Sequence, residues 1–124
     1  MSIDLARKIQ GNPKLSIIGV PTNSSGKSGV GVARAPNAIR SAGLIQVLSH
    51  YCEIYDERDV AFTLPVTDRD PDSGIIAYDA LVSMIQSVYK SVNNALTHGR
   101  FPLVIGGDCP ILLGCLAAVK RDSW

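Results

Sequence analysis

The sequence contains little of what marks several common classes of protein. Aromatic residues make up 6% and charged residues 19% of its 124 positions, and the formal net charge is +1. Its lysines and arginines are scattered and form no basic patch, which argues against nucleic-acid binding. Its apolar runs are far shorter than the ~18 residues that a membrane span needs, and its first residues lack the apolar stretch of a signal peptide. We therefore expect no nucleic-acid partner and no membrane partner.

Cysteine and histidine are also scarce. The three cysteines, Cys52, Cys109 and Cys115, are odd in number, and their spacing matches no zinc module. Free thiols are typical of a reduced compartment, so a cytoplasmic location is expected. Of the two histidines, His50 is interpreted as a surface residue, and His98 falls at the C-terminal end of an expected helix, where a cation is favourable.

Hydrophobic residues make up 46% of the chain, enough for one globular domain. Their patterns predict strands and helices that alternate along the chain. The strands are a buried one over 15–20, a more exposed one over 52–55 and one over 103–105. The helices are one from 36 with an apolar side at 39, 42 and 47, a long one over 75–98 and one over 110–119, while an irregular glycine-rich segment covers 22–35 and a Pro- and Asp-rich connection covers 62–74. Gly43 weakens or splits the first helix, and Gly99 ends the long one. This alternation predicts an α/β fold with a parallel sheet, in which the apolar 103–105 strand is expected to be central.

The segment around Gly106-Gly-Asp-Cys-Pro110 is the strongest candidate for a site. It joins a buried strand to a helix, so it places Asp108 and Cys109 at the carboxyl end of that strand, where open parallel sheets bind their ligands. His98 precedes the same strand. At ~3.3 Å per strand residue it lies over ~15 Å away at the opposite edge, which argues against a Cys109–His98 catalytic pair.

Three interpretations of the Asp108–Cys109 pair remain open. A helix N-terminus favours a thiolate, which together with the carboxylate could bind a divalent metal, or act alone as the nucleophile of a hydrolase. Alternatively, Asp108 caps the helix and Cys109 is a small buried residue. Cys115, six residues further on and off the same helical face, is expected in the core.

Ser25-Gly-Lys-Ser28 follows a strand and suggests a phosphate-binding loop. That motif needs a glycine five residues before Gly26, where this sequence has Pro21, and a helix directly after the Lys-Ser pair. We therefore favour a loop at the mouth of a site that does not bind a nucleotide.

Several separated segments resemble one family in order and spacing. They are Ile18-Gly-Val-Pro21, the glycine-rich loop, Ala35-Pro-Asn-Ala-Ile-Arg40 with Ala42-Gly-Leu44, Glu53-Ile-Tyr-Asp-Glu-Arg-Asp-Val60, and Gly99-Arg-Phe-Pro-Leu-Val-Ile-Gly-Gly-Asp108. Together they resemble the N-terminal part of the ureohydrolases, the family of arginase, agmatinase and formimidoylglutamase. The resemblance covers most of residues 15–119, with Arg58 where the family usually has glycine.

The resemblance implies a three-layer α/β/α fold with a parallel sheet, here truncated to its first strands and helices. It makes residues 1–124 the N-terminal portion of a single, incomplete arginase-like domain. It also implies hydrolysis of a guanidino or amidino C–N bond by a hydroxide that bridges two manganese ions, whose binding lowers the pKa of water. The implied partners are a small guanidino or amidino substrate and further copies of the chain in a homo-oligomer.

The resemblance also assigns site residues. Cys109 occupies the position of the family's first histidine metal ligand, Pro110 that of a small hydroxyl residue, and Asp108, Gly106 and Gly107 are supporting residues. Asn23, Ser24 and Ser25 are candidates for the substrate loop. A thiolate favours softer ions than manganese, so zinc at Cys109 is the alternative cofactor.

The family's later ligand motifs are absent from the sequence, which predicts that the 124-residue chain is inactive by itself. The alternative function is that of a non-catalytic interaction module, or truncated paralogue, that pairs with itself or with a full-length relative through the edge of the 103–105 strand.

Overall fold

The computed structural model describes residues 12–23, 30–63 and 68–122. The elements in chain order are β1 (Lys14–Val20), the 3₁₀ helix η2 (Gly31–Arg34), α1 (Ala35–Ser41), α2 (Leu44–Leu48), β2 (Glu53–Asp59), α3 (Tyr78–Thr97), β3 (Phe101–Gly106) and α4 (Ile111–Asp122). No helix in these parts of the chain is long and apolar enough to cross a membrane. The predicted alternation of strands and helices is confirmed.

The sheet has three strands in the order β2-β1-β3, and both pairs are parallel. In the β1–β3 pair, Leu15 lies opposite Phe101 and Val20 opposite Gly106. In the β1–β2 pair the register shifts at Glu57, because Ile17 pairs with Asp56 and Ile18 with Arg58. The strands therefore end together, which brings their carboxyl ends to one edge.

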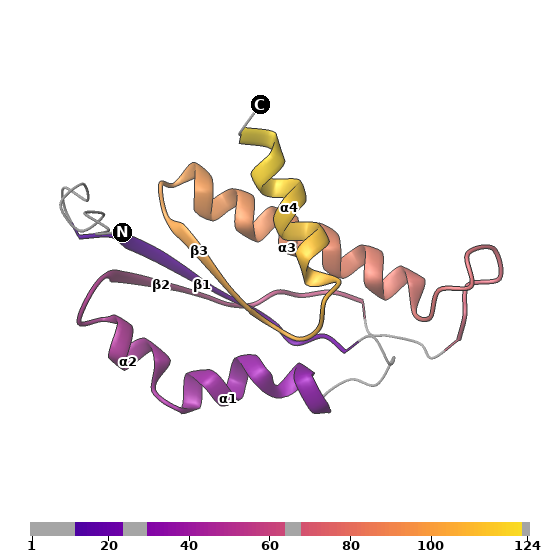
Figure 1. The fold of residues 1–124 in the computed structure, drawn as a ribbon, viewed down its shortest axis with the longest axis horizontal. Coiled ribbons are helices and arrows are strands. Elements are labelled where there is room, and N and C mark those ends of the chain that lie inside the picture. The colour runs from indigo at the N-terminus through magenta and orange to yellow at the C-terminus, as the bar shows by residue number, and fades with distance from the viewer. Residues whose placement is uncertain (1–11, 24–29, 64–67, 123–124) are drawn as a thin grey trace, which may run out of the picture.

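Helices cover both faces of this sheet, which gives the predicted three layers. Figure 1 shows α1 and α2 on one side of the strands and α3 and α4 on the other. The main core lies on the side of α3, where alternate residues of β1 meet the apolar stripe of α3 and the inner side of α4. Its buried members are Ile18, Val20, Met84, Val88, Val92, Ala95, Ile111 and Ala118. Burying an aliphatic side chain of this size stabilises a fold by about 1.5–3 kcal/mol.

Glycines set two helix boundaries as predicted. Gly43 adopts a φ of 99° between α1 and α2, so the expected single helix is split there. Gly99 adopts a φ of 66° after α3, while the Arg100 amide bonds the Ala95 carbonyl at 2.9 Å. Left-handed backbone of this kind favours glycine and ends helices by satisfying their last carbonyl groups.

Four details of the sequence prediction were wrong. The segment over 22–35 contains a regular element, η2, while α1 begins at Ala35, next to the expected Pro36 in its first turn. The positions 39, 42 and 47 are exposed, and Pro36 is the buried residue of α1. The second strand continues through the charged residues 56–59. Finally, β1 is the central strand and β3 is an edge strand among the described residues.

Candidate functional site

The turn after β3 lies at the carboxyl edge of the sheet. β3 ends at Gly106, α4 begins at Ile111, and the intervening turn follows directly beside the end of β1, since Val20 pairs with Gly106. Asp108 and Cys109 therefore occupy the edge where parallel sheets hold their ligands, as the sequence predicted.

Close packing explains the two glycines of this turn. A Cβ on Gly107 would lie 2.5 Å from the Thr22 carbonyl oxygen and 2.8 Å from that of Val20. A Cβ on Gly106 would lie 2.0 Å from Cδ1 of Ile111. The turn can lie against the end of β1 because Gly107 lacks a side chain, and the absence of one at Gly106 leaves room for Ile111 at the start of α4.

Asp108 and Cys109 differ in exposure. Asp108 is half-buried, one of its carboxylate oxygens is shielded from solvent, and its backbone carbonyl accepts the Ile111 amide at 3.3 Å. Cys109 is an exposed free thiol, and its carbonyl accepts the Leu112 amide at 3.0 Å. The interpretation of Cys109 as a small buried residue is therefore wrong.

One predicted substrate-loop residue reaches the same edge. Asn23 follows β1, and its side-chain amide donates to the Val30 carbonyl at 3.2 Å, which ties the two flanks of the intervening loop together. The other two candidates, Ser24 and Ser25, lie outside the described residues, as does the 25–28 segment weighed as a phosphate loop.

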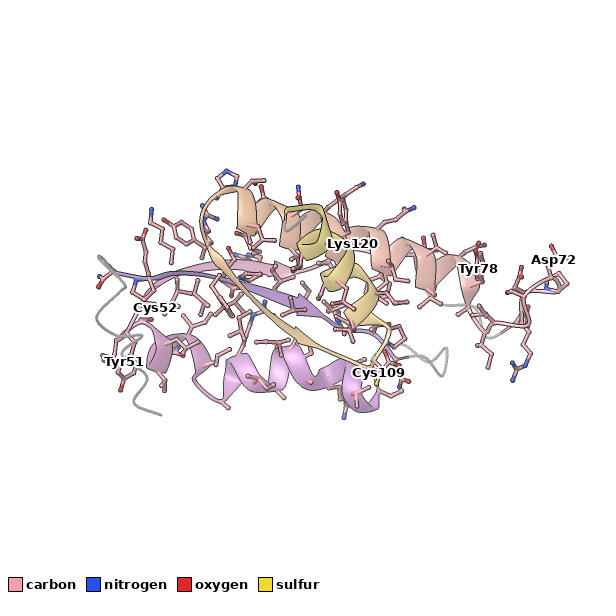
Figure 2. The ribbon with its side chains drawn as sticks, turned by 45° about the horizontal axis from the view of Figure 1, so that its top comes forward. Tyr51, Cys52, Asp72, Tyr78, Cys109 and Lys120 are labelled. Carbon is pink, nitrogen blue, oxygen red and sulfur yellow. The ribbon has the colours of Figure 1, made fainter. Side chains whose placement is uncertain are left out.

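Both histidines are far from this turn in the fold. His98 ends α3 just before β3, and His50 follows α2 just before β2, so both lie toward the amino edge of the sheet and both are exposed. The ring Nδ1 of His98 lies 2.7 Å from the Asn94 carbonyl. Figure 2 shows the distance between the edges, with Tyr51 and Cys52 at one end and Cys109 toward the other. The prediction that Cys109 and His98 do not pair is confirmed.

An arginine that the sequence did not single out fastens the helix layer to this edge. Arg40 of α1 forms ion pairs with Asp56 at 2.9 Å and Asp59 at 2.6 Å, both on β2. Burial acts to lower the pKa of Arg40, but hydrogen bonds and charge attraction from the two aspartates outweigh it, and the pKa is raised. A Cβ on Gly19 would lie 1.9 Å from an Asp59 carboxylate oxygen, so this glycine makes room for the pair.

A second polar cluster lies on the α3 side of the sheet. Glu57 accepts a hydrogen bond from the Ser16 hydroxyl at 3.2 Å and pairs with Arg100 at 2.9 Å, while the Arg100 guanidinium lies 3.6 Å from the Tyr55 ring centroid. A shallow hollow of about 230 Å³ adjoins it, lined by Glu57, Lys90, Ser91 and Asn94. The cluster binds all three strands together, because its members come from β1, β2 and the residue before β3.

The remaining thiols lie away from the turn. Cys52 donates to the Leu48 carbonyl at 3.3 Å, next to the amino end of β2. Cys115 packs against the main core, as predicted, and burial raises the pKa of its thiol.

The residues of this chain do not by themselves fit a two-manganese centre. Within the described ranges, no group of three or more His, Cys, Asp and Glu side chains is arranged to hold a metal. The turn offers one carboxylate and one thiol, and a thiolate prefers softer ions than manganese. The set of donors is therefore too small and partly of the wrong kind.

Comparison with known proteins gives one consistent result. The sequence profile of the arginase family matches residues 13–123. The arginase of Staphylococcus aureus strain MSSA476 is 34% identical over 112 residues, which cover 86% of this chain and 36% of that protein. The arginase of Brevibacillus brevis is 36% identical over 111 residues, which cover 89% of this chain and 37% of that protein.

The comparison with solved structures agrees with these sequence comparisons. The native arginase of Bacillus caldovelox superimposes with a TM-score of 0.78 at 33% identity, over 90% of this chain and 37% of that one. The chain thus spans little more than a third of the length of the relatives that it matches.

Proposed function

Because the chain belongs to the arginase family, we propose that it supplies the N-terminal portion of a hydrolase acting on the C–N bond of a small guanidino or amidino substrate. The observation that carries this proposal is the Gly106–Pro110 turn, which lies at the carboxyl edge of the sheet within the segment that the family profile matches. In this proposal residues 1–124 form part of one domain rather than a domain complete in itself.

Each residue at this edge receives a role from its position. Gly107 lets the turn contact the end of β1, and Gly106 leaves room for the Ile111 side chain. Asp108 supports the turn, and Cys109 stands in the position of the family's first metal-ligand histidine. Asn23, at the end of the segment that follows β1, is proposed as a substrate-loop residue, and Ser24 and Ser25 remain candidates for the same role on the resemblance alone.

The chain alone should not catalyse the reaction. Two-manganese chemistry, as implied for the family, requires a set of oxygen and imidazole donors that the described residues lack. We therefore assign no catalytic step to this chain by itself, and zinc at Cys109 remains the alternative ion.

Urea release tests the proposal of inactivity. The purified chain should release no urea from arginine or agmatine with added manganese, and the Bacillus caldovelox arginase serves as the positive control. Urea release that a chelator abolishes would contradict the proposal.

Metal analysis tests the role of Cys109. After incubation with manganese and removal of free ion, Cys109→His should retain more manganese than the unaltered chain, because imidazole suits this ion better than thiolate. Cys115→His, which places imidazole in the core, is the control. Equal and negligible metal in all three proteins would reject a preserved half-site.

A second candidate function is interaction without catalysis, supported by the edge of β3 that no strand within 12–23, 30–63 and 68–122 covers. The chain would then pair with a copy of itself or with a full-length relative. Size-exclusion chromatography tests self-pairing, and a stable monomer at all concentrations would count against it.

A cytoplasmic location accords with three free thiols. Fractionation of the cells that express the chain would test it.

A further inference from the structure

The hollow between β2 and α3 is lined by charged and polar side chains that the proposed function does not use. Its volume is about 230 Å³, and its lining residues are Glu57 of β2 with Lys90, Ser91 and Asn94 of α3. Pockets for drug-sized ligands run from roughly 300 to 1,000 Å³. A hollow of this smaller size therefore suits a molecule of only a few non-hydrogen atoms.

The carboxylate of Glu57 is fixed before any ligand arrives. Its Oε1 accepts the Ser16 hydroxyl at 3.2 Å and the Arg100 guanidinium at 2.9 Å. Ser16 is fully buried, and the Arg100 guanidinium lies 3.6 Å from the Tyr55 ring centroid, so both partners are themselves held. Because both contacts end on Oε1, Oε2 keeps its capacity to accept a hydrogen bond from a ligand. A group that is already positioned reduces the entropic cost of binding.

The α3 side of the hollow supplies donors. Lys90 and Asn94 are four residues apart on one face of the helix, and Ser91 is next to Lys90. Among the residues that the structure describes, no ion pair holds the Lys90 ammonium group. An ammonium, a hydroxyl and a carboxamide can all donate hydrogen bonds, and they lie across the hollow from one carboxylate acceptor.

The charges of the lining select the class of ligand. Glu57 is already paired with Arg100, so Lys90 gives the hollow an unmatched positive charge, which repels a metal cation. A phosphate would meet the Glu57 carboxylate, and the amides inside a helix are already bonded to its carbonyl groups. A molecule with a carboxylate at one end and an ammonium group at the other satisfies both sides of the hollow.

We propose that the hollow between β2 and α3 binds a small zwitterion of the amino-acid type. The carboxylate of this ligand pairs with Lys90, and its ammonium group donates to Oε2 of Glu57. The hydroxyl of Ser91 and the carboxamide of Asn94 donate to the same ligand carboxylate.

This hollow is separate from the candidate site. Glu57 is bonded to Ser16 of β1, whereas the turn that follows β3 lies beside Val20, which pairs with Gly106. At ~3.3 Å per strand residue, the interval from Ser16 to Val20 is about 13 Å. The proposal therefore does not depend on the hydrolase activity, and its test needs no catalysis.

Amide NMR spectra of the isotope-labelled chain test the proposal. Glycine and β-alanine are the zwitterionic probes, and acetate and methylammonium are the controls that carry one charge each. At least one zwitterion should shift the resonances of Glu57 and residues 90–94, with a millimolar Kd at least about fivefold below that of either control. Equal affinity for acetate or methylammonium, or no shift at the hollow, would overturn the proposal while leaving the urea-release test of the proposed function unaffected.

Matched lysine variants localise the binding. Lys90→Met keeps an aliphatic side chain but removes the ammonium group, and it should weaken zwitterion binding about fivefold. Lys120→Met makes the same change at an exposed lysine of α4, outside the hollow, and should leave the affinity unchanged. Circular dichroism verifies that both variants remain folded. Equal effects of the two substitutions, or no effect of Lys90→Met, would contradict the assigned site.

Discussion

The two outer strands of the sheet, β2 and β3, have opposite designs. Of the seven residues of β2, five are charged, and Asp56, Asp59 and Glu57 are held by Arg40 and Arg100. A bulge at Glu57 also twists the strand. β3 has no charge, its pairing with β1 has no bulge, and no other strand in the described part of the chain pairs with its second side. The two edges of the described sheet thus differ in composition, since β2 carries the charges and the bulge typical of a natural edge and β3 carries neither.

The contrast extends to how each strand is anchored. β2 is fastened by side chains, because Arg40 reaches it from α1 and Arg100 from the position just before β3. The end of β3 is instead held by close packing of the backbone, because the turn at Gly107 lies directly against Val20 and Thr22. Loss of one side chain should therefore affect β2 moderately, whereas an added atom at the end of β3 should affect it strongly.

The largest effect is expected from Gly107→Ala. The new methyl group would meet carbonyl oxygens of Val20 and Thr22 that cannot move freely, so we expect a loss of about 3 kcal/mol in the free energy of unfolding. Gly74→Ala is the control, since Gly74 has a φ of 71° with no atom within 4 Å, and backbone strain alone should cost about 1 kcal/mol. Urea denaturation measures both, and equal losses would show that the β3 end is not tightly packed.

Arg40→Ala should have the next largest effect. It removes two ion pairs from a side chain that is 18% exposed, and we expect a loss of about 1.5 kcal/mol that shrinks as salt is raised. Arg69→Ala, which removes a single hydrogen bond to the Gly74 carbonyl on an exposed turn, should cost less. A salt-independent loss would mean that packing rather than charge fastens β2.

Arg58→Gly should stabilise the chain. Arg58 adopts a φ of 64° beside the bulge, which strains a residue with a side chain by about 1 kcal/mol or more, and glycine relieves this strain. The melting temperature should therefore rise. Arg58→Ala, which keeps a Cβ, is the control and should produce no comparable gain. An unchanged or lower melting temperature for the glycine variant would show that the Arg58 side chain contributes more than its backbone costs.

The smallest effect concerns the two thiols near β3. Burial raises the pKa of Cys115, so below that pKa its thiolate fraction is reduced, while Cys109 is exposed. At pH 8 iodoacetamide should therefore modify Cys109 about tenfold faster than Cys115, and the ratio should fall as pH rises. Mass spectrometry of digested samples gives both rates, and faster modification of Cys115 would mean that the α3–α4 contact opens readily.

Local sequence signals predicted most of the fold. The apolar run of β1, the three- and four-residue spacing of α3, and the glycines at 43, 99, 106 and 107 set boundaries that the structure reproduces closely. These features act over a few residues, so one sequence suffices to identify them. The strand-end position of Asp108 and Cys109 followed from the same signals.

Tertiary contacts explain what the sequence did not predict. The predicted strand stopped before the charged end of β2, because nothing local shows that Arg40 and Arg100 pair with it from 16 residues before Asp56 and 43 residues after Glu57. The exposure of Ile39 and Val47 was missed for a similar reason, since the buried residue of α1 is Pro36 and α2 has none. The left-handed backbone of Arg58 could be suspected only because the family usually has glycine at this position.

The most direct test of the contrast between the edges is amide hydrogen exchange of the chain with and without a full-length arginase-family relative. Pairing through the uncharged edge should slow exchange in β3, while β2 keeps the rates of the free chain. Protection of β2, or no new protection at β3, would contradict the proposal that β3 is the edge that pairs.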